Sequence, residues 1–146
     1  MTTLRRKGVL AIDHGTKRCG FAAIDGLRIA ATPLDAHHGT GDALALWKHI
    51  DRLLGERDID TMLLGFPFNM DGTSGARANE VEAFALEFAR RHPQLRIVKY
   101  DERLTTKAAE ELLRDAGHRG REAKLRRDSW SALVLLRDWI AAGEPD

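Results

Sequence analysis

The chain has a single cysteine, no long apolar run and almost no net charge, and each absence excludes a class of protein. One cysteine, Cys19, excludes an internal disulfide and a zinc site built from several cysteines. No apolar stretch approaches the ~20 residues that a membrane-spanning helix needs. A formal net charge of +1 means that affinity for nucleic acid must come from local clusters of basic side chains.

The composition is that of an ordinary folded domain. Apolar residues make up 43% and charged residues 31% of the 146 residues, enough for one hydrophobic core. The first residues, Met-Thr-Thr-Leu-Arg-Arg-Lys, carry charge without an apolar stretch behind them, so we expect no signal peptide. We predict a soluble cytoplasmic protein with one domain over residues 1–146, ordered from about residue 8 to 140, with a frayed tail at 141–146.

Three apolar segments near the N-terminus predict an antiparallel meander. Gly8–Asp13 and Cys19–Ile24 are separated by a glycine-rich turn. Asp25-Gly26 is a two-residue hairpin signal that leads into a third strand, Leu27–Ala31. Pro33 is expected to end that strand.

After the meander, helices alternate with strands. His37 and His38 fall in a glycine-containing loop, where neighbouring side chains diverge and we expect no metal role. The later elements are a helix from its cap Asp42 to Gly55, a strand at Thr61–Leu64, a helix at Ala76–Arg91 capped by Ser74, a strand at Arg96–Tyr100, a helix from Thr105 or Thr106 to about Arg114, and a last helix to about Ala142. This order predicts an α/β fold with a mixed sheet.

Acidic residues end two of the predicted strands. Asp13 closes the first, where loss of hydration requires a hydrogen bond, a cation or a metal; alternatively, Asp13 only caps a turn. Asp101 and Glu102 follow the strand Arg96–Tyr100 and would point to opposite faces. We choose Glu102 as the functional acid and keep Asp101 in reserve.

A third acid, Asp128, lies on the apolar face of the last predicted helix, three residues after Leu125 and four before Ala132. There a carboxylate needs a cationic partner, unless Asp128 is instead the N-cap of a helix that begins at Ser129. Three converging carboxylates without histidine or cysteine would favour Mg²⁺ or Mn²⁺ over zinc. Such clusters commonly hold two ions that promote phosphodiester cleavage.

Four segments in this order carry a resemblance to a known family: Asp13-His-Gly-Thr-Lys-Arg-Cys-Gly20, Gly65-Phe-Pro-Phe-Asn-Met-Asp-Gly72, Asp101-Glu-Arg-Leu-Thr-Thr106, and Asp128-Ser with Ala132. Together they resemble the YqgF family of RNase H-like proteins, named as Holliday-junction-resolvase homologues and pre-16S rRNA nucleases. The resemblance extends from about Gly8 to Ile140. It implies an RNase H-like fold, with a mixed five-stranded sheet of three antiparallel strands and then alternating helices and strands, flanked by helices.

The resemblance also implies divalent-metal-dependent phosphodiester hydrolysis. The expected activity is processing of the 5′ end of pre-16S rRNA in ribosome biogenesis, and the alternative is resolution of four-way DNA junctions. Carried across, the catalytic and metal-binding residues are Asp13, Glu102 and Asp128, which would hold two Mg²⁺ or Mn²⁺ ions, with Asp101 in reserve. Candidate substrate-binding residues are Gly15, Lys17, Arg18, Asn69, Arg77, Arg103, Arg126 and Arg127.

The expected partners are nucleic acid, with RNA favoured and branched DNA as the alternative, and a pre-ribosomal particle, but no membrane. The chain would act as a monomer or a homodimer. Two residues depart from the family pattern. His14 stands beside the first acid, where it could modulate metal binding or contact substrate. Trp130 stands where the family pattern has a smaller aliphatic residue. We expect its ring to pack in the core rather than to stack on a base.

Two other kinds of protein fit parts of the sequence. Asp13-x-Gly15-Thr16 after a strand resembles the phosphate loop of actin-type ATPases and sugar kinases, although those enzymes close two related domains around the nucleotide. A non-catalytic RNA-binding module would use the segment Arg114–Arg127, which holds six basic and two acidic side chains.

The basic segment generates a test of nucleic-acid contact. Neutralising Arg126 and Arg127 together should weaken RNA binding and flatten its dependence on salt, because each phosphate contact releases counterions. The measurement is the binding constant over a series of salt concentrations. An unchanged slope of log K against log salt would contradict contact by this segment.

Overall fold

The computed structural model describes residues 6–39, 43–68, 75–102 and 121–146, the side chains of 121–127 excepted. The elements are β1 (Gly8–His14), β2 (Arg18–Ile24), β3 (Thr32–His38), α1 (Ala43–Gly55), β4 (Ile59–Phe66), α2 (Ala76–Arg91), β5 (Arg96–Asp101) and α4 (Arg121–Ala141). The helix predicted from Thr105 or Thr106 to Arg114 lies outside these residues, as do the predicted caps Asp42 and Ser74.

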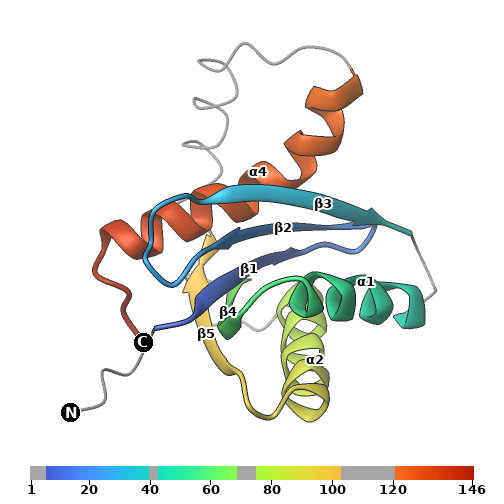
Figure 1. The fold of residues 1–146 in the computed structure, drawn as a ribbon. Coiled ribbons are helices and arrows are strands. Elements are labelled where there is room, and N and C mark those ends of the chain that lie inside the picture. The colour runs from blue at the N-terminus through green and yellow to red at the C-terminus, as the bar shows by residue number, and fades with distance from the viewer. Residues whose placement is uncertain (1–5, 40–42, 69–74, 103–120) are drawn as a thin grey trace.

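The strands form one five-stranded sheet in the order β3-β2-β1-β4-β5 (Figure 1). β1 pairs antiparallel with β2, and β2 with β3, whereas β4 runs parallel to both β1 and β5. The predicted mixed sheet is therefore confirmed. The central strands are continuous apolar runs, as expected where helices cover both faces.

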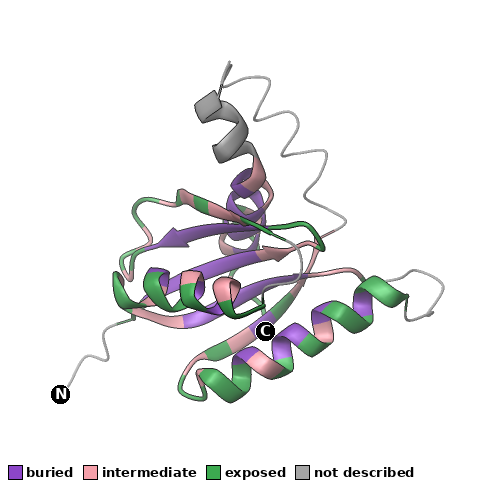
Figure 2. Cartoon of the chain, turned by 90° about the vertical axis from the view of Figure 1, so that its right-hand side faces the viewer, coloured by how far each residue is buried: buried purple, intermediate pink, exposed green. Residues whose placement is uncertain are grey.

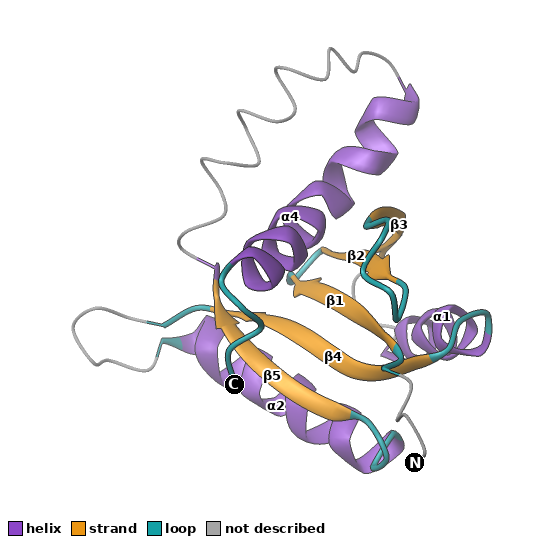
Figure 3. Ribbon diagram, turned by 60° about the vertical axis from the view of Figure 1, so that its left-hand side comes forward, coloured by secondary structure: helices purple, strands orange, loops and turns teal. Residues whose placement is uncertain are grey.

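The two faces of the sheet hold separate apolar clusters. On one face, Leu10 and Ile12 of β1 pack with residues of α1 and α2. On the other, Val9 and Ala11 pack against α4. Figure 3 shows α4 on one side of the sheet and α1 and α2 on the other. In Figure 2 the buried residues of α2 form one stripe with exposed residues opposite, as its sequence pattern predicted.

The connection after β2 differs from the predicted two-residue hairpin. Leu27–Ala31 is not a strand, and β3 begins only at Thr32. The cause is Asp25, whose carboxylate accepts hydrogen bonds from the backbone N–H groups of Leu27 at 3.0 Å, Ile29 at 2.9 Å and Ala30 at 3.2 Å. Asp25 thus organises a longer loop and leaves Leu27 and Ile29 exposed.

The prediction that Pro33 ends the meander is also wrong, because Pro33, His37 and His38 all belong to β3. β3 is an edge strand, and an edge strand tolerates a residue that cannot donate to a neighbour on one side. The two histidines therefore have fixed positions in the sheet rather than places in a loop.

The C-terminal residues are tied down, contrary to the predicted frayed tail. The Trp139 indole donates to the Pro145 carbonyl at 2.7 Å, and the Glu144 carboxylate accepts from Arg28 at 3.1 Å. Arg6 also binds Glu144. These contacts join the end of the chain to the start of β1 and to the loop after β2.

The last helix starts earlier than one interpretation of the sequence required. Since α4 begins at Arg121, Asp128 lies inside it and is not its N-cap. Trp130 is 8% exposed within the cluster under α4, which confirms its role in packing. In the part of the chain that the structure describes, no helix combines the length and the apolar character needed to cross a membrane.

Gly20 sets the distance between α4 and the sheet. A Cβ atom at Gly20 would lie 2.1 Å from the carbonyl oxygen of Asp128 and 3.0 Å from Cα of Ser129. Both are backbone atoms that cannot move aside alone, so any side chain at this position would push the helix away from β2.

We therefore expect Gly20→Ala to lower the free energy of unfolding by about 1–3 kcal/mol, the usual cost of overpacking. Urea denaturation monitored by tryptophan fluorescence would measure it. Gly55→Ala is the matched control, because a Cβ there meets nothing within 4 Å and the change should be neutral or stabilising. Equal stability of Gly20→Ala and wild type would contradict the close approach of α4.

Candidate active site

Two carboxylates lie on the same face of the sheet, at the carboxyl ends of parallel strands. Asp13 follows Val9 and Ala11 on the face of β1 that α4 covers. Glu102 comes directly after β5, two residues beyond Tyr100, which packs on the same side. The charge of Glu102 raises the pKa of Asp13, so the two acids are close enough to interact.

Two glycines lie beside this pair. Gly20 is the partner of Asp13 on β2, and Gly65 lies on β4, between β1 and β5. A Cβ atom at Gly65 would touch Leu135 at 3.4 Å and the Glu102 carboxylate at 3.5 Å. A side chain larger than a methyl group at Gly65 would therefore fill the space beside the acids.

Arg77, near the start of α2, forms a two-pronged ion pair with Glu102. Nη2 of Arg77 donates to both carboxylate oxygens at 2.9 Å, and Nε donates to Oε1 at 3.2 Å. The start of α2 faces the edge of the sheet where β4 and β5 end (Figure 3). A fixed cation thus balances one acid of the pair and adds directional hydrogen bonds.

The surroundings of Asp13 destabilise its ionised form. Burial is the main cause that raises the pKa of Asp13, and repulsion by Glu102 raises it further. The guanidinium groups of Arg77 and Arg18 lower it, but not enough to restore the ordinary value. A further positive charge beside Asp13 would stabilise its ionised form.

The carboxylate of Asp128 contacts residues of β2 and β3. Its side chain is 5% exposed, with Oδ2 at 2.9 Å from Nε2 of His38 and Oδ1 at 3.5 Å from Nε of Arg18. The backbone of Asp128 lies over Gly20, the partner of Asp13 on β2, yet its carboxylate contacts Arg18 of β2 and His38 of β3. The structure therefore brings Asp13 and Glu102 together, but not the carboxylate of Asp128.

The acid pair fits a divalent cation in its chemistry. Asp13 and Glu102 offer only oxygen donors, which Mg²⁺ and Mn²⁺ prefer, and their mutual repulsion is what such an ion would relieve. Among the described residues, no three histidine, cysteine, aspartate or glutamate side chains are grouped closely enough to share one ion. To join the pair as a third ligand, Asp128 would have to leave His38 and Arg18.

The turn after β1 carries two basic residues, Lys17 and Arg18, and the charge of Arg18 acts on Asp13. A Cβ atom at Gly15 would lie 2.5 Å from the carbonyl oxygen of Arg18, so this tight turn requires glycine. Lys17 is exposed, and its carbonyl accepts a hydrogen bond from the backbone N–H of Gly39 at 3.2 Å. The Arg18 side chain is 62% exposed while it contacts Asp128, which leaves much of it open to a ligand.

Two residues considered from the sequence lie on the opposite face. The ring of His14 packs against Phe84 of α2, with 4.5 Å between the centroids, and burial lowers the pKa of His14. Asp101 alternates with Glu102 and falls on the side of Lys99, which binds Glu82 of α2. Neither His14 nor Asp101 shares the face of Asp13.

Some predicted substrate contacts cannot be placed. Asn69 and Arg103 lie outside the described residues. Arg126 and Arg127 belong to α4, immediately before Asp128, but their side chains are outside the described part. Their roles stay predictions.

Sequence reasoning missed two residues that hold Asp128 in place. His38 was expected in a loop, because the third strand was predicted at Leu27–Ala31 and not at Thr32–His38. Ser129 is fully buried; its hydroxyl accepts from the backbone N–H of Phe21 at 3.1 Å and donates to the carbonyl of Leu34 at 2.5 Å. The signal for Ser129 was its place next to Asp128 on a buried helix face.

The sequence matches a family model described as RuvX, Holliday junction resolvase, over residues 7–142. A protein of Acetivibrio thermocellus named "Putative pre-16S rRNA nuclease" is 35% identical over 132 residues, covering 90% of this chain and 94% of the relative. A protein of Anaeromyxobacter sp. strain Fw109-5 with the same name is 39% identical over 133 residues, covering 90% of this chain and 94% of the relative.

A solved structure described as Thermus thermophilus RuvC in complex with Holliday junction substrate aligns with a TM-score of 0.58. The alignment covers 95% of this chain and 98% of the RuvC chain at 13% identity. RuvC without substrate aligns with a TM-score of 0.57 at 12% identity. The fold is therefore RNase H-like, as the sequence resemblance implied.

The electrostatics of the acid pair predict a pH-dependent stability difference. Because the folded state raises the pKa of Asp13, the folded protein binds the proton more tightly than the unfolded chain, and Asp13 costs stability increasingly as the pH rises through the raised pKa. In EDTA, Asp13→Asn should therefore gain stability relative to wild type as the pH rises above the ordinary pKa of an aspartate, and the gain should stop growing above the raised pKa.

Thermal unfolding of both proteins at each pH would measure this difference. Asp58→Asn is the control, because the Asp58 side chain is 80% exposed and its removal should leave the pH profile unchanged. A constant difference between Asp13→Asn and wild type across the pH range would show that Asp13 is not strained by its surroundings.

Proposed function

Because the chain belongs to the RuvX family, described as Holliday junction resolvases, we propose that it is a divalent-metal-dependent nuclease whose substrate is the 5′-extended precursor of 16S rRNA. The observation that carries this proposal is the pairing of Asp13 with Glu102 at the carboxyl ends of parallel strands, beside the basic turn at Lys17 and Arg18.

The choice of RNA rests on the relatives, and the alternative rests on the family description. The curated relatives are named for pre-16S rRNA, whereas the family model and the solved RuvC complex are named for the Holliday junction. Resolution of a junction needs two active sites related by two-fold symmetry, so that alternative also predicts a homodimer. A nuclease for the rRNA precursor can act as a monomer.

Asp13 and Glu102 are the residues that would hold the ions. A bound Mg²⁺ or Mn²⁺ supplies activation of a water molecule and stabilisation of the leaving oxygen. The protein contributes a rigid placement of both carboxylates, because one is fixed in β1 and the other follows β5 in the same sheet. The absence of a side chain at Gly65 leaves space beside the Glu102 carboxylate on that face.

The basic side chains have separate roles in this proposal. Arg77 holds the Glu102 carboxylate in one orientation through its two-pronged ion pair. Lys17 and Arg18 contact substrate phosphates, which fix the position of the strand without reading its sequence. Binding of a phosphate to Arg18 would release one of the two contacts of the Asp128 carboxylate, and the closer contact with His38 would also have to break before Asp128 could serve as a third ligand.

The sequence also suggested two other kinds of protein, an actin-type ATPase and a non-catalytic RNA-binding module. The family match favours a nuclease over an actin-type ATPase. A non-catalytic RNA-binding module is separated from a nuclease by cleavage alone, since both would bind RNA with a marked dependence on salt.

The test is cleavage of a 5′-extended 16S rRNA precursor and of a four-way DNA junction, side by side, with Mn²⁺, Mg²⁺ or EDTA. We expect metal-dependent cutting of the RNA, and loss of at least about a hundredfold in rate for Asp13→Asn, Glu102→Gln and Asp128→Asn. Asp101→Asn should keep near wild-type activity, because Asp101 lies on the other face.

The outcomes separate the possible functions. Cutting of the junction alone, together with a dimer in solution, would replace the rRNA proposal with junction resolution. Binding of RNA without cutting under any metal condition would leave only the binding module. Full activity of Asp128→Asn would remove Asp128 from the site, and Asp58→Asn serves as the control for a lost surface acid.

A further inference from the structure

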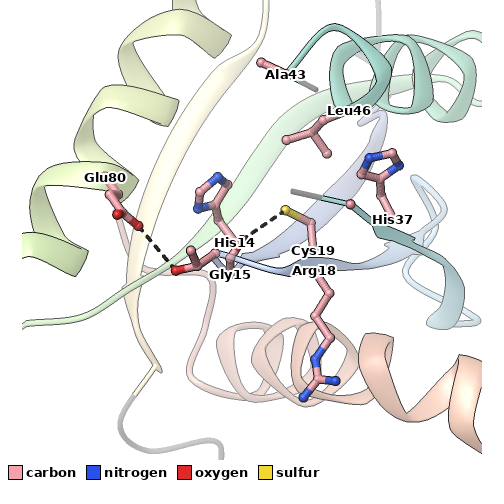
Figure 4. A pocket seen from close by; sticks show the side chains of 10 residues that line it. His14, Gly15, Arg18, Cys19, His37, Ala43, Leu46 and Glu80 are labelled. Carbon is pink, nitrogen blue, oxygen red and sulfur yellow. Dashed lines mark hydrogen bonds between the residues drawn. The ribbon is translucent and has the colours of Figure 1, made fainter. Parts of the chain in front are cut away.

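A cavity of about 310 Å³ lies behind the acid pair, on the other face of the sheet. It opens among the turn after β1, the end of β3, the start of α1 and the first turns of α2 (Figure 4). Asp13 and His14 are consecutive residues of β1, so Asp13 points to the α4 face and His14 lines this cavity. Its volume is at the lower end of the range of small-molecule sites, ~300–1,000 Å³.

The cavity has flat, ring-bearing walls. His14 and His37 stand on opposite sides of it, with Leu46 between them above Cys19 (Figure 4). The His14 ring belongs to a chain of ring contacts: its centroid lies 4.5 Å from that of Phe84 with 34° between the planes, and Phe84 stacks on Trp47 at 5.1 Å with 12° between the planes. A planar ring that entered the cavity could pack on His14, whose ring is supported from behind by Phe84.

The polar groups of the cavity suit a neutral ligand that donates hydrogen bonds. Glu80 lies at one side, where its carboxylate accepts a hydrogen bond from the Thr16 hydroxyl at 3.5 Å. The guanidinium of Arg18 points away from the cavity, toward α4 and Asp128 (Figure 4). A phosphate inside the cavity would therefore meet a carboxylate instead of a cation, whereas an amino group would find an acceptor.

We propose that this cavity binds one unpaired nucleobase of the strand that is cut. This rests on the proposed function, because the cavity and the acid pair are then two parts of one substrate site. The turn at Gly15 to Arg18 separates them: phosphates lie on its basic outer side, and one base turns into the cavity and stacks on His14. A base must leave its helix to enter, so the enzyme acts where the substrate is single-stranded or opened.

The position of Glu80 also sets a preference among bases. The exocyclic amino groups of cytosine, adenine and guanine donate to a carboxylate, as in direct readout of cytosine by acidic side chains. Uracil presents carbonyl oxygens at the corresponding places, which the Glu80 carboxylate repels. The cavity thus selects a base with an amino group at one position near the cut.

The test is a scan of abasic sites in a fluorescein-labelled single-stranded oligoribonucleotide of about 12 nucleotides. Binding to the full chain is measured by fluorescence anisotropy in EDTA, so that no cleavage occurs. We expect one position, and not its neighbours, at which loss of the base weakens binding by about five- to 150-fold, the range for one base stacked on an aromatic side chain.

Two variants then assign that position to the cavity. Ala43→Trp fills the cavity from the start of α1 and should weaken binding of the intact strand to the level of the abasic one. Leu44→Trp is the matched control, since Leu44 is 56% exposed and does not line the cavity. Glu80→Gln should reduce the difference between cytosine and uracil at the sensitive position.

The outcomes also distinguish this inference from the proposed function. If the protein cuts RNA but no abasic position weakens binding, or if Ala43→Trp and Leu44→Trp behave alike, the cavity does not hold a base although the nuclease proposal stands. If the sensitive position exists and Ala43→Trp removes it, but no substrate is cut, the base site stands and the nuclease proposal fails. Absence of any binding to the oligoribonucleotide would overturn the base site.

Discussion

The arrangement of the site depends on one buried contact, that of the Ser129 hydroxyl with both strands of the β2–β3 pair. It accepts from the N–H of Phe21 and donates to the carbonyl of Leu34, at the place where the register of these strands shifts. The Ser129 side chain of α4 thus provides a hydrogen-bond partner for two backbone groups at the irregular point of the β2–β3 pairing. Because Gly20 lets the helix approach at the same point, Ser129 fixes the preceding residue, Asp128, over Gly20 of β2, whose partner on β1 is Asp13.

The acid pair shows the opposite kind of constraint, in which the fold holds together groups that repel each other. Burial and the Glu102 charge both act against ionised Asp13, and Arg77 offsets only part of the cost. Such strain is typical of functional sites, since a structural role would be served by a neutral side chain. The rest of the sheet, with apolar clusters on both faces, provides the stability that tolerates it.

The sequence was a good guide where the pattern was local and regular. The buried strands, the helix Ala76–Arg91 and the face of Asp128 followed from periodicity, and the order of elements indicated the mixed sheet. The prediction of a two-residue hairpin after β2 was wrong. The dipeptide Asp25-Gly26 is compatible both with a tight turn and with a longer loop in which the Asp25 carboxylate accepts from three later N–H groups, and the sequence does not distinguish them. That error also concealed His38, whose partner is ninety residues further along the chain. Side-chain contacts of this kind depend on tertiary packing and leave no periodic signal in the sequence.

The alternation of side chains along β1 has a mechanical consequence. Asp13 and His14 are joined by one peptide bond and face opposite sides of a sheet that helices cover on both faces. The offset between them is therefore set by covalent geometry, and movement of the surrounding loops cannot alter it. If a nucleic-acid strand wraps around the end of β1, the distance between its contacts with Asp13 and His14 is fixed. The phosphodiester bond opposite Asp13 would then always lie the same number of nucleotides from the base held against His14.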